Sequence, residues 1–326
     1  MSTSAITYLD LVKACDNYPH IDVSKLPSAE GEDPAFYQLL LPDDPRPLGY
    51  IHPSVVRKMP WTSDFVVSPP EERPRTVQLL DSSNGRDTSA ACNAAFEKVI
   101  QAAHDGGVFQ SLSRPLREDF RVLGARYPPV QLKRSAAGLF GIACRGAHMT
   151  VYTRTPEGLK IWVPKRSAHL KTWPGKLDTS VAGGVRAEES PFECIIHEAD
   201  EEASLPEDLV RKNVKACGAV TYLCESGSGS GGEFGLMVPD VLYVFDLEVA
   251  QDVILKPQDD EVEAFYLWDV QQVKDALLRK EFKTNCASVM IDFFVRHGII
   301  TDDNEPDYLE IVTRLHRALP VPLTSK

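Results

Sequence analysis

The segment that most constrains this chain is residues 183–205, which read GGVRAEESPFECIIHEADEEASL. A paired glycine is followed at a short distance by Glu198, Glu201 and Glu202. On a helix, carboxylates three and four residues apart are neighbours, and their like charges repel. A chain that keeps such a cluster either leaves it in solvent or uses it to bind a cation.

The same segment predicts an amphipathic helix. Ser190 is a favoured N-cap residue, and Pro191 suits the first helical turn. At about 100° per residue, the three glutamates fall in a sector of about 100° beside an apolar stripe. We therefore expect the helix to pack on a sheet and to hold its carboxylates at one edge of the contact, where oxygen ligands can bind a hard cation such as Mg²⁺. The stripe consists of Phe192, Ile195, Ile196, Ala199 and Ala203.

Composition excludes several classes of partner. The 326 residues carry a formal net charge of -12, which opposes binding to a phosphate backbone and so predicts no nucleic-acid partner. Apolar runs stay well short of the ~20 residues of a membrane helix, so we expect no membrane partner. Seven scattered cysteines without a CxxC pair indicate reduced thiols, and the N-terminal residues make a poor targeting signal, so we expect a cytoplasmic protein.

The order of elements predicts two domains. Residues 1–130 are expected to form an N-terminal α+β domain, and residues 131–326 a second domain with mixed strands and few helices. That order indicates an α+β sandwich and argues against a doubly wound parallel sheet. Gly227, Gly229 and Gly232 satisfy a GxGxxG pattern, but an extended segment with a proline follows, so we interpret them as a hairpin loop and not as a dinucleotide site.

The acidic segment resembles the Nudix box of the Nudix hydrolases. In that pattern a Gly, five residues, a Glu and seven residues precede the run R-E-U-x-E-E-x-G-U, where U is a bulky aliphatic residue. Gly183, Glu189 and the run from His197 to Leu205 reproduce both gaps. His197 stands where the family has Arg, and Ser204 replaces the Gly that gives an easy left-handed C-cap. All four glutamates of the pattern are present: Glu189, Glu198, Glu201 and Glu202.

The resemblance implies a Nudix α/β/α sandwich, an enzyme and a metal. Mg²⁺ or Mn²⁺ would be held by Glu198 and Glu202, with Glu201 assisting and a backbone carbonyl at Gly183. The reaction would be hydrolysis of a diphosphate that is linked to another moiety. A further carboxylate often comes from a later loop, for which the chain offers Glu261 and Glu263; we favour Glu261.

A narrower resemblance extends over most of the chain. It is to the branch related to the Nudix domain of fungal thiamine pyrophosphokinase fusion proteins and to its stand-alone relatives in plants and yeast. The substrate implied is thiamine diphosphate or an oxidised or damaged analogue, such as oxothiamine or oxythiamine diphosphate, cleaved to the monophosphate and phosphate. The matching segments include YLDLVKACDNYPH, LLLPDDPRPLGYIHPSVVRKM, LFGIACRGAHMTVY, LKIWVPKRS, TWPGKLDTSVAGG and DDEVEAFYLWDV.

Three residues can be given substrate roles from their chemistry. Lys165 and Arg166 end a predicted strand and can grip a diphosphate, whereas Trp173 can stack on a heteroaromatic ring. Alternatives remain open: a nucleoside diphosphate derivative as substrate, a non-catalytic Nudix-fold binding module, or an isomerase on the same fold. A homodimer is compatible with all of them.

Overall fold

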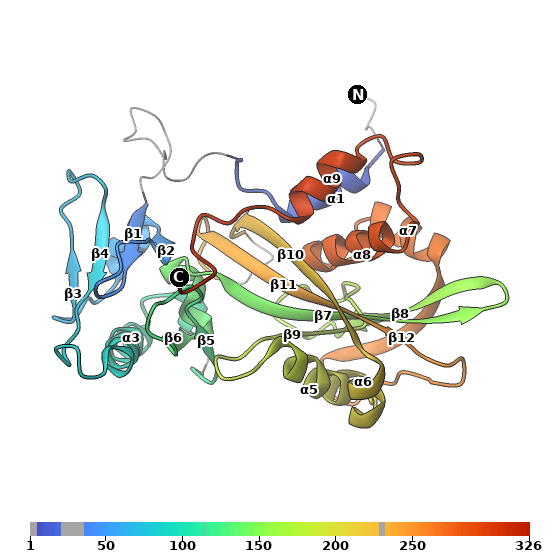
Figure 1. Ribbon diagram of the computed structural model, residues 1–326, viewed down its shortest axis with the longest axis horizontal. Coiled ribbons are helices and arrows are strands. Elements are labelled where there is room, and N and C mark those ends of the chain that lie inside the picture. Colours follow the sequence, from blue (N-terminus) through green and yellow to red (C-terminus); the bar gives the residue numbers. More distant parts are fainter. Residues whose placement is uncertain (1–4, 21–35, 114, 228–231) are drawn as a thin grey trace.

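The computed structural model describes residues 5–20, 36–113, 115–227 and 232–326. Two sheets lie side by side along the long axis of the molecule, each with its own helices (Figure 1). The smaller part at the left of the view comes mainly from the first 140 residues, and the larger part from the rest. The molecule therefore has the two α+β parts that the sequence predicts.

The smaller part is built around a four-stranded sheet of order β2-β1-β4-β3, with a separate β5–β6 hairpin beside it. Helix α3 starts after the N-cap Asp87, whose carboxylate accepts the amide of Ala90 at 3.0 Å. It ends at Gly106, as the Gly-Gly pair predicts. The elements are β1 (Tyr37–Leu40), β2 (Gly49–Ile51), α2 (Pro53–Lys58), β3 (Phe65–Val67), β4 (Thr76–Leu79), α3 (Thr88–Asp105), η2 (Gln110–Leu112), β5 (Asp119–Arg121), β6 (Gln131–Lys133), η3 (Arg134–Ala136) and α4 (Ala137–Phe140).

The larger part is built around a six-stranded sheet of order β10-β11-β7-β8-β12, with β9 paired to β7. The β11–β7 pair is parallel, and the other pairs are antiparallel. The elements are β7 (Cys144–Thr155), β8 (Gly158–Arg166), β9 (Val181–Gly184), α5 (Pro191–Ala203), α6 (Glu207–Asn213), β10 (Lys215–Glu225), β11 (Met237–Glu248), β12 (Val262–Asp269), α7 (Val270–Leu278), α8 (Thr284–Arg296) and α9 (Tyr308–Leu315).

One edge of β7 is shared by two partners. Its N-terminal half pairs with β9 and its C-terminal half pairs with β8, so the sheet divides between these two strands. The segment that joins β8 to β9 and the helix that follows β9 lie at this division. The division therefore brings the paired glycine, the acidic helix and the end of β8 into one region.

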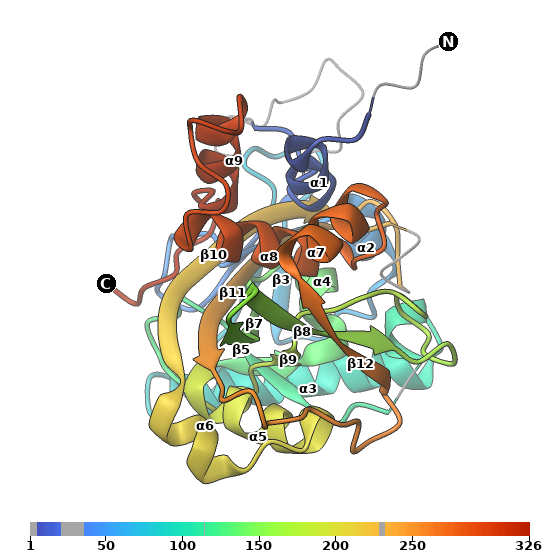
Figure 2. The same ribbon diagram turned by 90° about the vertical axis from the view of Figure 1, so that its right-hand side faces the viewer.

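Helices cover both faces of the larger sheet (Figures 1 and 2). Helices α5 and α6 lie on one face, over a core that includes Met149, Ile195 and Leu247. Helices α7, α8 and α9 lie on the other face, together with α1 (Tyr8–Cys15) from the start of the chain. This is the α/β/α sandwich that the sequence predicts.

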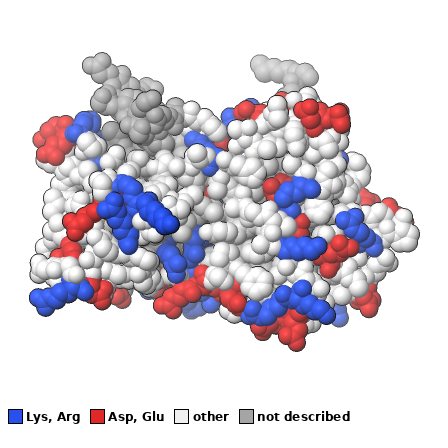
Figure 3. Space-filling view, in the orientation of Figure 1, with Lys and Arg blue, Asp and Glu red and all other residues white. Residues whose placement is uncertain are grey.

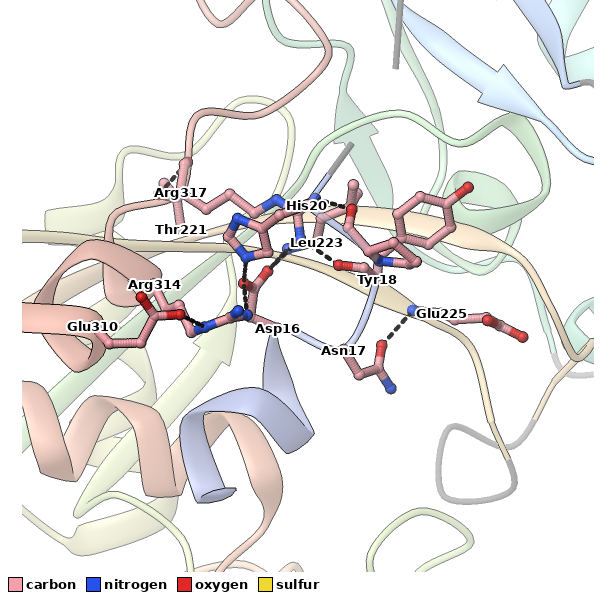
Figure 4. A network of polar contacts seen from close by, with 11 residues as sticks. Asp16, Asn17, Tyr18, His20, Thr221, Leu223, Glu225, Glu310, Arg314 and Arg317 are labelled. Atoms are coloured by element: carbon pink, nitrogen blue, oxygen red, sulfur yellow. Dashed lines mark hydrogen bonds and ion pairs between the residues drawn. The ribbon is translucent and has the colours of Figure 1, made fainter. Parts of the chain in front are cut away.

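Helix α1 packs against α8 and α9 and not against the smaller part of the molecule. Its anchor is Asp16, which follows the helix and lies among Arg317, Arg314, His20 and the backbone of β10 (Figure 4). The core of the smaller part runs from Tyr37 to Ile142 along the chain and also includes Leu236. The division at residue 130 stays a prediction.

Other sequence-based expectations can be compared directly with the structure. All seven cysteines are free thiols. Strand β11 follows β10 as an antiparallel partner, so Gly227 and Gly232 belong to a hairpin connection as predicted, whereas Gly229 lies outside the described residues. None of the helices in the described part of the chain combines the length and apolar character needed to cross a bilayer. Basic and acidic side chains are intermixed on the face shown in Figure 3.

Candidate functional site

Helix α5 forms as its sequence predicts. Ser190 caps it by accepting the amide of Glu193 at 3.1 Å, and Pro191 is the first helical residue. The helix ends at Ser204, which adopts the left-handed conformation (φ 53°) although it is not glycine. The Ser204 hydroxyl donates to the carbonyl of Lys256 at 3.1 Å, a contact that helps to hold this conformation.

The first glycine of the pair makes room for a carboxylate. A β-carbon at Gly183 would overlap the Cδ and Oε1 atoms of Glu198. A side chain at this position would therefore have to displace the Glu198 carboxylate, for which glycine leaves room. The result is a carboxylate lying directly on the backbone of β9, beside a row of peptide groups.

Two glutamates of the helix lie in a poorly solvated position. Burial, reinforced by the charge of Glu201, raises the pKa of Glu198 to about 7. Burial and the nearby Glu198 raise the pKa of Glu202 well above its ordinary value, although Glu202 accepts the amide of Ala182 at 3.1 Å. Within the described chain, neither Glu198 nor Glu202 forms an ion pair with a Lys, Arg or His side chain. Glu201 is exposed.

A small pocket beside Glu202 joins four segments of the chain. It contains Arg166 from the end of β8 and Glu261 from the loop before β12, so the structure brings these two predicted residues to the acidic helix. The charge of Glu261 also acts on both Glu198 and Glu202. The lining residues are Pro164, Arg166, Asp178, Thr179, Glu202, Glu261 and Val262.

The other two substrate-binding candidates lie near this pocket without lining it. Lys165 Nζ bonds Glu263 Oε1 at 2.8 Å across the β8–β12 pair, so its charge is already paired. Trp173 is half-buried in the segment between β8 and β9. Arg166 Nη2 reaches the carbonyl of the neighbouring Thr172 at 3.4 Å, which connects the Trp173 segment to the pocket.

A buried network behind the pocket was missed by sequence reasoning. Asp178 accepts Arg166 Nη1 at 3.0 Å and the thiol of Cys286 at 2.6 Å, and Lys283 Nζ lies 4.0 Å from it. Burial would raise the pKa of Asp178, but Lys283, His148 and Arg166 together lower it to about 2. Its ionised carboxylate therefore holds the Arg166 guanidinium in place. Asp178 and Cys286 are 108 positions apart, so no local motif could have revealed the network.

His148, Asp178 and Cys286 place potential ligand atoms within 4.8 Å of one another, which is also a metal-like arrangement. The surrounding charges argue against a cation there, because Arg166 and Lys283 already neutralise Asp178. Burial and Asp178 also raise the pKa of the Cys286 thiol far above its ordinary value, which keeps it protonated. This cluster is a hydrogen-bonded support for Arg166.

His197, which stands where the family pattern has Arg, pairs with the first glutamate of the motif. Its Nδ1 atom lies 2.6 Å from Glu189 Oε1, so it ties the middle of α5 to the segment between β9 and the helix. Glu189 is largely buried and His197 is half-exposed. The pairing fixes the strand-to-helix connection from which Glu198 extends.

The carboxylate set fits a hard divalent cation. Glu198 and Glu202 are unpaired, crowded and partly desolvated, and carboxylate oxygens are the ligands that Mg²⁺ and Mn²⁺ prefer. A cation between them would offset the repulsion that raises both pKa values. Glu201 and the backbone of Gly183 border the same position and stay candidate ligands.

Sequence comparisons identify the family to which this region is similar. The model of the NUDIX domain matches residues 145–287, which include β9, α5 and the Glu261 loop. An uncharacterized protein of Saccharomyces cerevisiae is 44% identical over 211 residues, 63% of this chain and 62% of that protein. Nudix hydrolase 20, chloroplastic, of Arabidopsis thaliana is 35% identical over 68% of this chain and 57% of its own length. Nudix hydrolase 24, chloroplastic, of the same plant is 35% identical over 273 residues, 82% of this chain and 70% of its own length.

The chain thus spans about 60% of the length of the first two relatives, with shares of 62% and 57%. Among solved structures, a binary complex of the Caenorhabditis elegans Ap4A hydrolase covers 48% of this chain at 11% identity, with a TM-score of 0.35 and 99% of that chain matched. The MutT protein of Methanosarcina mazei covers 47% of this chain and 91% of its own, with 18% identity and a TM-score of 0.33.

Proposed function

Because this chain belongs to the Nudix hydrolase family, we propose that it hydrolyses the diphosphate of a small molecule with the help of a divalent cation. The observation that carries the proposal is the arrangement of Glu198 and Glu202. Both lie on one edge of α5 with raised pKa values, and the carboxylate of Glu198 occupies the space that Gly183 leaves open. Arg166 and Glu261 complete the site in the same pocket as Glu202.

Each residue has a distinct role in the proposed reaction. A divalent cation, when bound, neutralises phosphoryl oxygens and acidifies water. Glu198 and Glu202 hold it, with Glu201 and the Gly183 carbonyl assisting. Arg166, fixed by Asp178 at 3.0 Å, binds a phosphoryl oxygen, and Glu261 accepts a proton from the attacking water.

The water oxygen then bonds to one phosphorus while the bridging P–O bond breaks. The bridging oxygen leaves with the other phosphorus, so the products are a monophosphate and inorganic phosphate when the substrate is a diphosphate ester. No side chain of the protein forms a covalent bond with phosphorus in this scheme.

We propose thiamine diphosphate, or an oxidised or damaged analogue of it, as the substrate. Besides the sequence resemblance, the surroundings of Trp173 support this choice. The Trp173 segment also contains His169, whose Nε2 lies 3.5 Å from Asp260 in the acidic loop before β12. An indole can stack on a heteroaromatic ring, and an acidic loop near this segment suits a ring that carries positive charge. Lys165 is a further candidate for binding the diphosphate, if it exchanges its ion pair with Glu263 for one with a phosphoryl oxygen.

Release of phosphate from the thiamine compounds, or of the two monophosphates from ADP-ribose, tests both the reaction and the substrate. The protein is incubated with thiamine diphosphate, oxothiamine diphosphate or ADP-ribose, in Mg²⁺, in Mn²⁺ or in chelator. We expect turnover of the thiamine compounds with either metal and none in chelator. Turnover of ADP-ribose alone would keep the reaction and move the substrate to nucleoside diphosphate derivatives. Folded protein that cleaves none of the three would favour a binding module.

A Glu202→Gln variant tests the role of the helix. Glutamine keeps the shape of the side chain and the bond to Ala182 but removes the charge. We expect activity to fall roughly 100- to 1000-fold, because a catalytic metal lowers the barrier by several kcal/mol and each tenfold change in rate corresponds to about 1.4 kcal/mol. In chelator the variant is expected to be at least as stable as the parent, because the charge that it lacks is poorly solvated in the folded protein. Full activity in this variant would exclude α5 from the mechanism.

A further inference from the structure

The smaller part of the molecule extends an arginine to the acidic helix. Arg134, the first residue of η3, lies across the second glycine of the pair: a β-carbon at Gly184 would be 2.9 Å from its Cζ atom and 3.1 Å from its Nη1 atom. The guanidinium also lies 5.4 Å above the ring of Phe120 in β5. Gly183 and Gly184 therefore leave room for two different groups, a carboxylate from α5 and a guanidinium from the preceding part of the chain.

A second arginine is joined to the first by a carboxylate. Glu118 Oε2 accepts Arg134 Nη1 at 2.6 Å, while its Oε1 lies 3.5 Å from Nε of Arg186, which follows β9. The single carboxylate of Glu118 thus pairs with the guanidinium groups of both Arg134 and Arg186. Arg134 covers Gly184, and the adjacent Gly183 is covered by the carboxylate of Glu198, so this bridge lies beside the candidate metal position.

Hydrogen bonds hold the backbone on both sides of this bridge in place. The amide of Ala187 donates to the carbonyl of Asp119 at 2.8 Å, which joins the segment after β9 to β5. The amide of Arg134 donates to the carbonyl of Glu118 at 2.8 Å. Arg145, a buried residue of β7, donates its Nη2 to the carbonyl of Arg186 at 2.7 Å. An arginine whose backbone is held in this way loses little freedom when it binds an anion.

We propose that Arg134 and Arg186, positioned by Glu118, bind the phosphoryl group of the diphosphate that lies on the Glu198 side of the site, so that the smaller part of the molecule completes the substrate site. This inference rests on the proposed function. Arg166 and the Arg134–Glu118–Arg186 bridge then hold the diphosphate from two sides, with the acidic helix between them. An isolated larger domain would lack one of these sides.

Binding of magnesium imidodiphosphate, a diphosphate that resists hydrolysis, tests the proposal on the full chain by calorimetry. Arg134→Gln is expected to weaken binding about tenfold, the usual scale for one charge-assisted contact at a partly exposed site. Arg134→Lys is expected to recover part of the loss, because it restores the charge without the planar fork. The Michaelis constant for the substrate is expected to rise by the same factor with kcat little changed, as for a contact made equally in ground and transition states.

Arg126→Gln is the matched control. Arg126 has a similar side-chain exposure (46% against 52% for Arg134), lies in the same part of the molecule and pairs with a carboxylate, Asp44. We expect its binding and Michaelis constants to match those of the parent. Gly184→Ala keeps every charge but displaces the Arg134 guanidinium, so it is expected to weaken binding as Arg134→Gln does.

Equal affinities in the parent, Arg134→Gln and Arg126→Gln would overturn the inference, and so would a parent that does not bind magnesium imidodiphosphate. A loss of melting temperature in Arg134→Gln without any change in affinity would show that the bridge only joins the two parts of the molecule. A parent that binds the analogue through Arg134 but turns over no diphosphate would overturn the proposed function and leave this inference standing.

Discussion

The molecule withdraws carboxylates from solvent in two regions, fully at Asp16 and partly at Glu198 and Glu202, and satisfies them differently. Asp16, whose side chain is 1% exposed, accepts Arg317 Nη1 at 2.8 Å and the amide of Leu223 at 3.0 Å (Figure 4). His20 and Arg314 complete its surroundings at 2.6 and 3.4 Å. By contrast, Glu202 receives one backbone amide, and Glu198 has no ion-pair partner among the described residues.

The difference is the one we expect between a structural carboxylate and a proposed metal ligand. Moving a carboxylate out of water costs several kcal/mol unless cations and hydrogen bonds replace the lost hydration. Asp16 receives both from the chain itself, which ties the N-terminal helix to the C-terminal segment. The carboxylates of α5 receive neither in full, and their raised pKa values record the deficit. A group that the chain leaves unsatisfied is one that a ligand has to satisfy.

The largest effect is expected on stability from Asp16→Ala. Removing this carboxylate leaves Arg317 buried without its charge partner, which typically costs about 3–5 kcal/mol. For a chain of this size, such a loss lowers the melting temperature by roughly 10 °C. Thermal unfolding measures the loss, and we expect the activity per folded molecule to be unchanged.

Glu310→Gln provides the control for that experiment. Glu310 bonds Arg314 at 2.7 Å in the same network, but its side chain is 50% exposed. Exposed ion pairs contribute about 0–1 kcal/mol, so we expect a shift of at most a few degrees. If the two variants were destabilised equally, burial would not be what distinguishes Asp16.

The next effect is a dependence of metal-free stability on pH. Below about pH 4.5 Glu198 is protonated in the folded and the unfolded state alike. Between that pH and about 7 the unfolded chain has lost the proton that the folded protein keeps, so the folded state binds more protons and its stability falls as pH rises. Above about 7 the contribution of Glu198 is constant. Glu202 shifts in the same direction, so its contribution also falls with rising pH.

Mg²⁺ is expected to reverse this loss. At a concentration of 100 times Kd, a ligand that binds only the folded state adds about 2.7 kcal/mol. Because protons compete for the same oxygens, the gain in melting temperature from Mg²⁺ is expected to be larger at pH 8 than at pH 5.5. Melting curves with Mg²⁺ or chelator at the two pH values measure it. A gain that was the same at both pH values, or that persisted in Glu202→Gln, would place the metal elsewhere.

The sequence was sufficient for the parts of the site that are local. The spacings from Gly183 to Glu189 and from Glu189 to Glu198 are read directly from the sequence. Helical periodicity then places Glu198 and Glu202 on one edge of α5. The expected helix start at Pro191 and the α/β/α sandwich are both present in the structure.

The non-local parts could not be predicted from one sequence. Asp178 supports Arg166 together with Cys286, and Arg134 reaches Gly184 through a contact between two parts of the chain. Asp16 and Arg317 are 301 positions apart. Such pairs depend on how the sheets and helices pack, which periodicity does not encode. Similarly, the family pattern has glycine at the end of α5, but Ser204 adopts the left-handed conformation here and its hydroxyl bonds a carbonyl in a distant loop.

The smallest effect is expected at the residue that departs from the family pattern. His197→Ala removes the 2.6 Å contact to Glu189, which orients the segment leading to the metal carboxylates. Changing a residue that only orients metal ligands typically costs 10- to 100-fold, and we expect the lower end, roughly tenfold in Mg²⁺ affinity, because His197 is half-exposed. His197→Arg is expected to retain full affinity, since guanidinium can replace imidazole in the bond to Glu189. Asp200→Ala, an exposed change on the same helix, is the control; an equal loss there would mean that the helix as a whole, and not the pairing with Glu189, is what His197 supports.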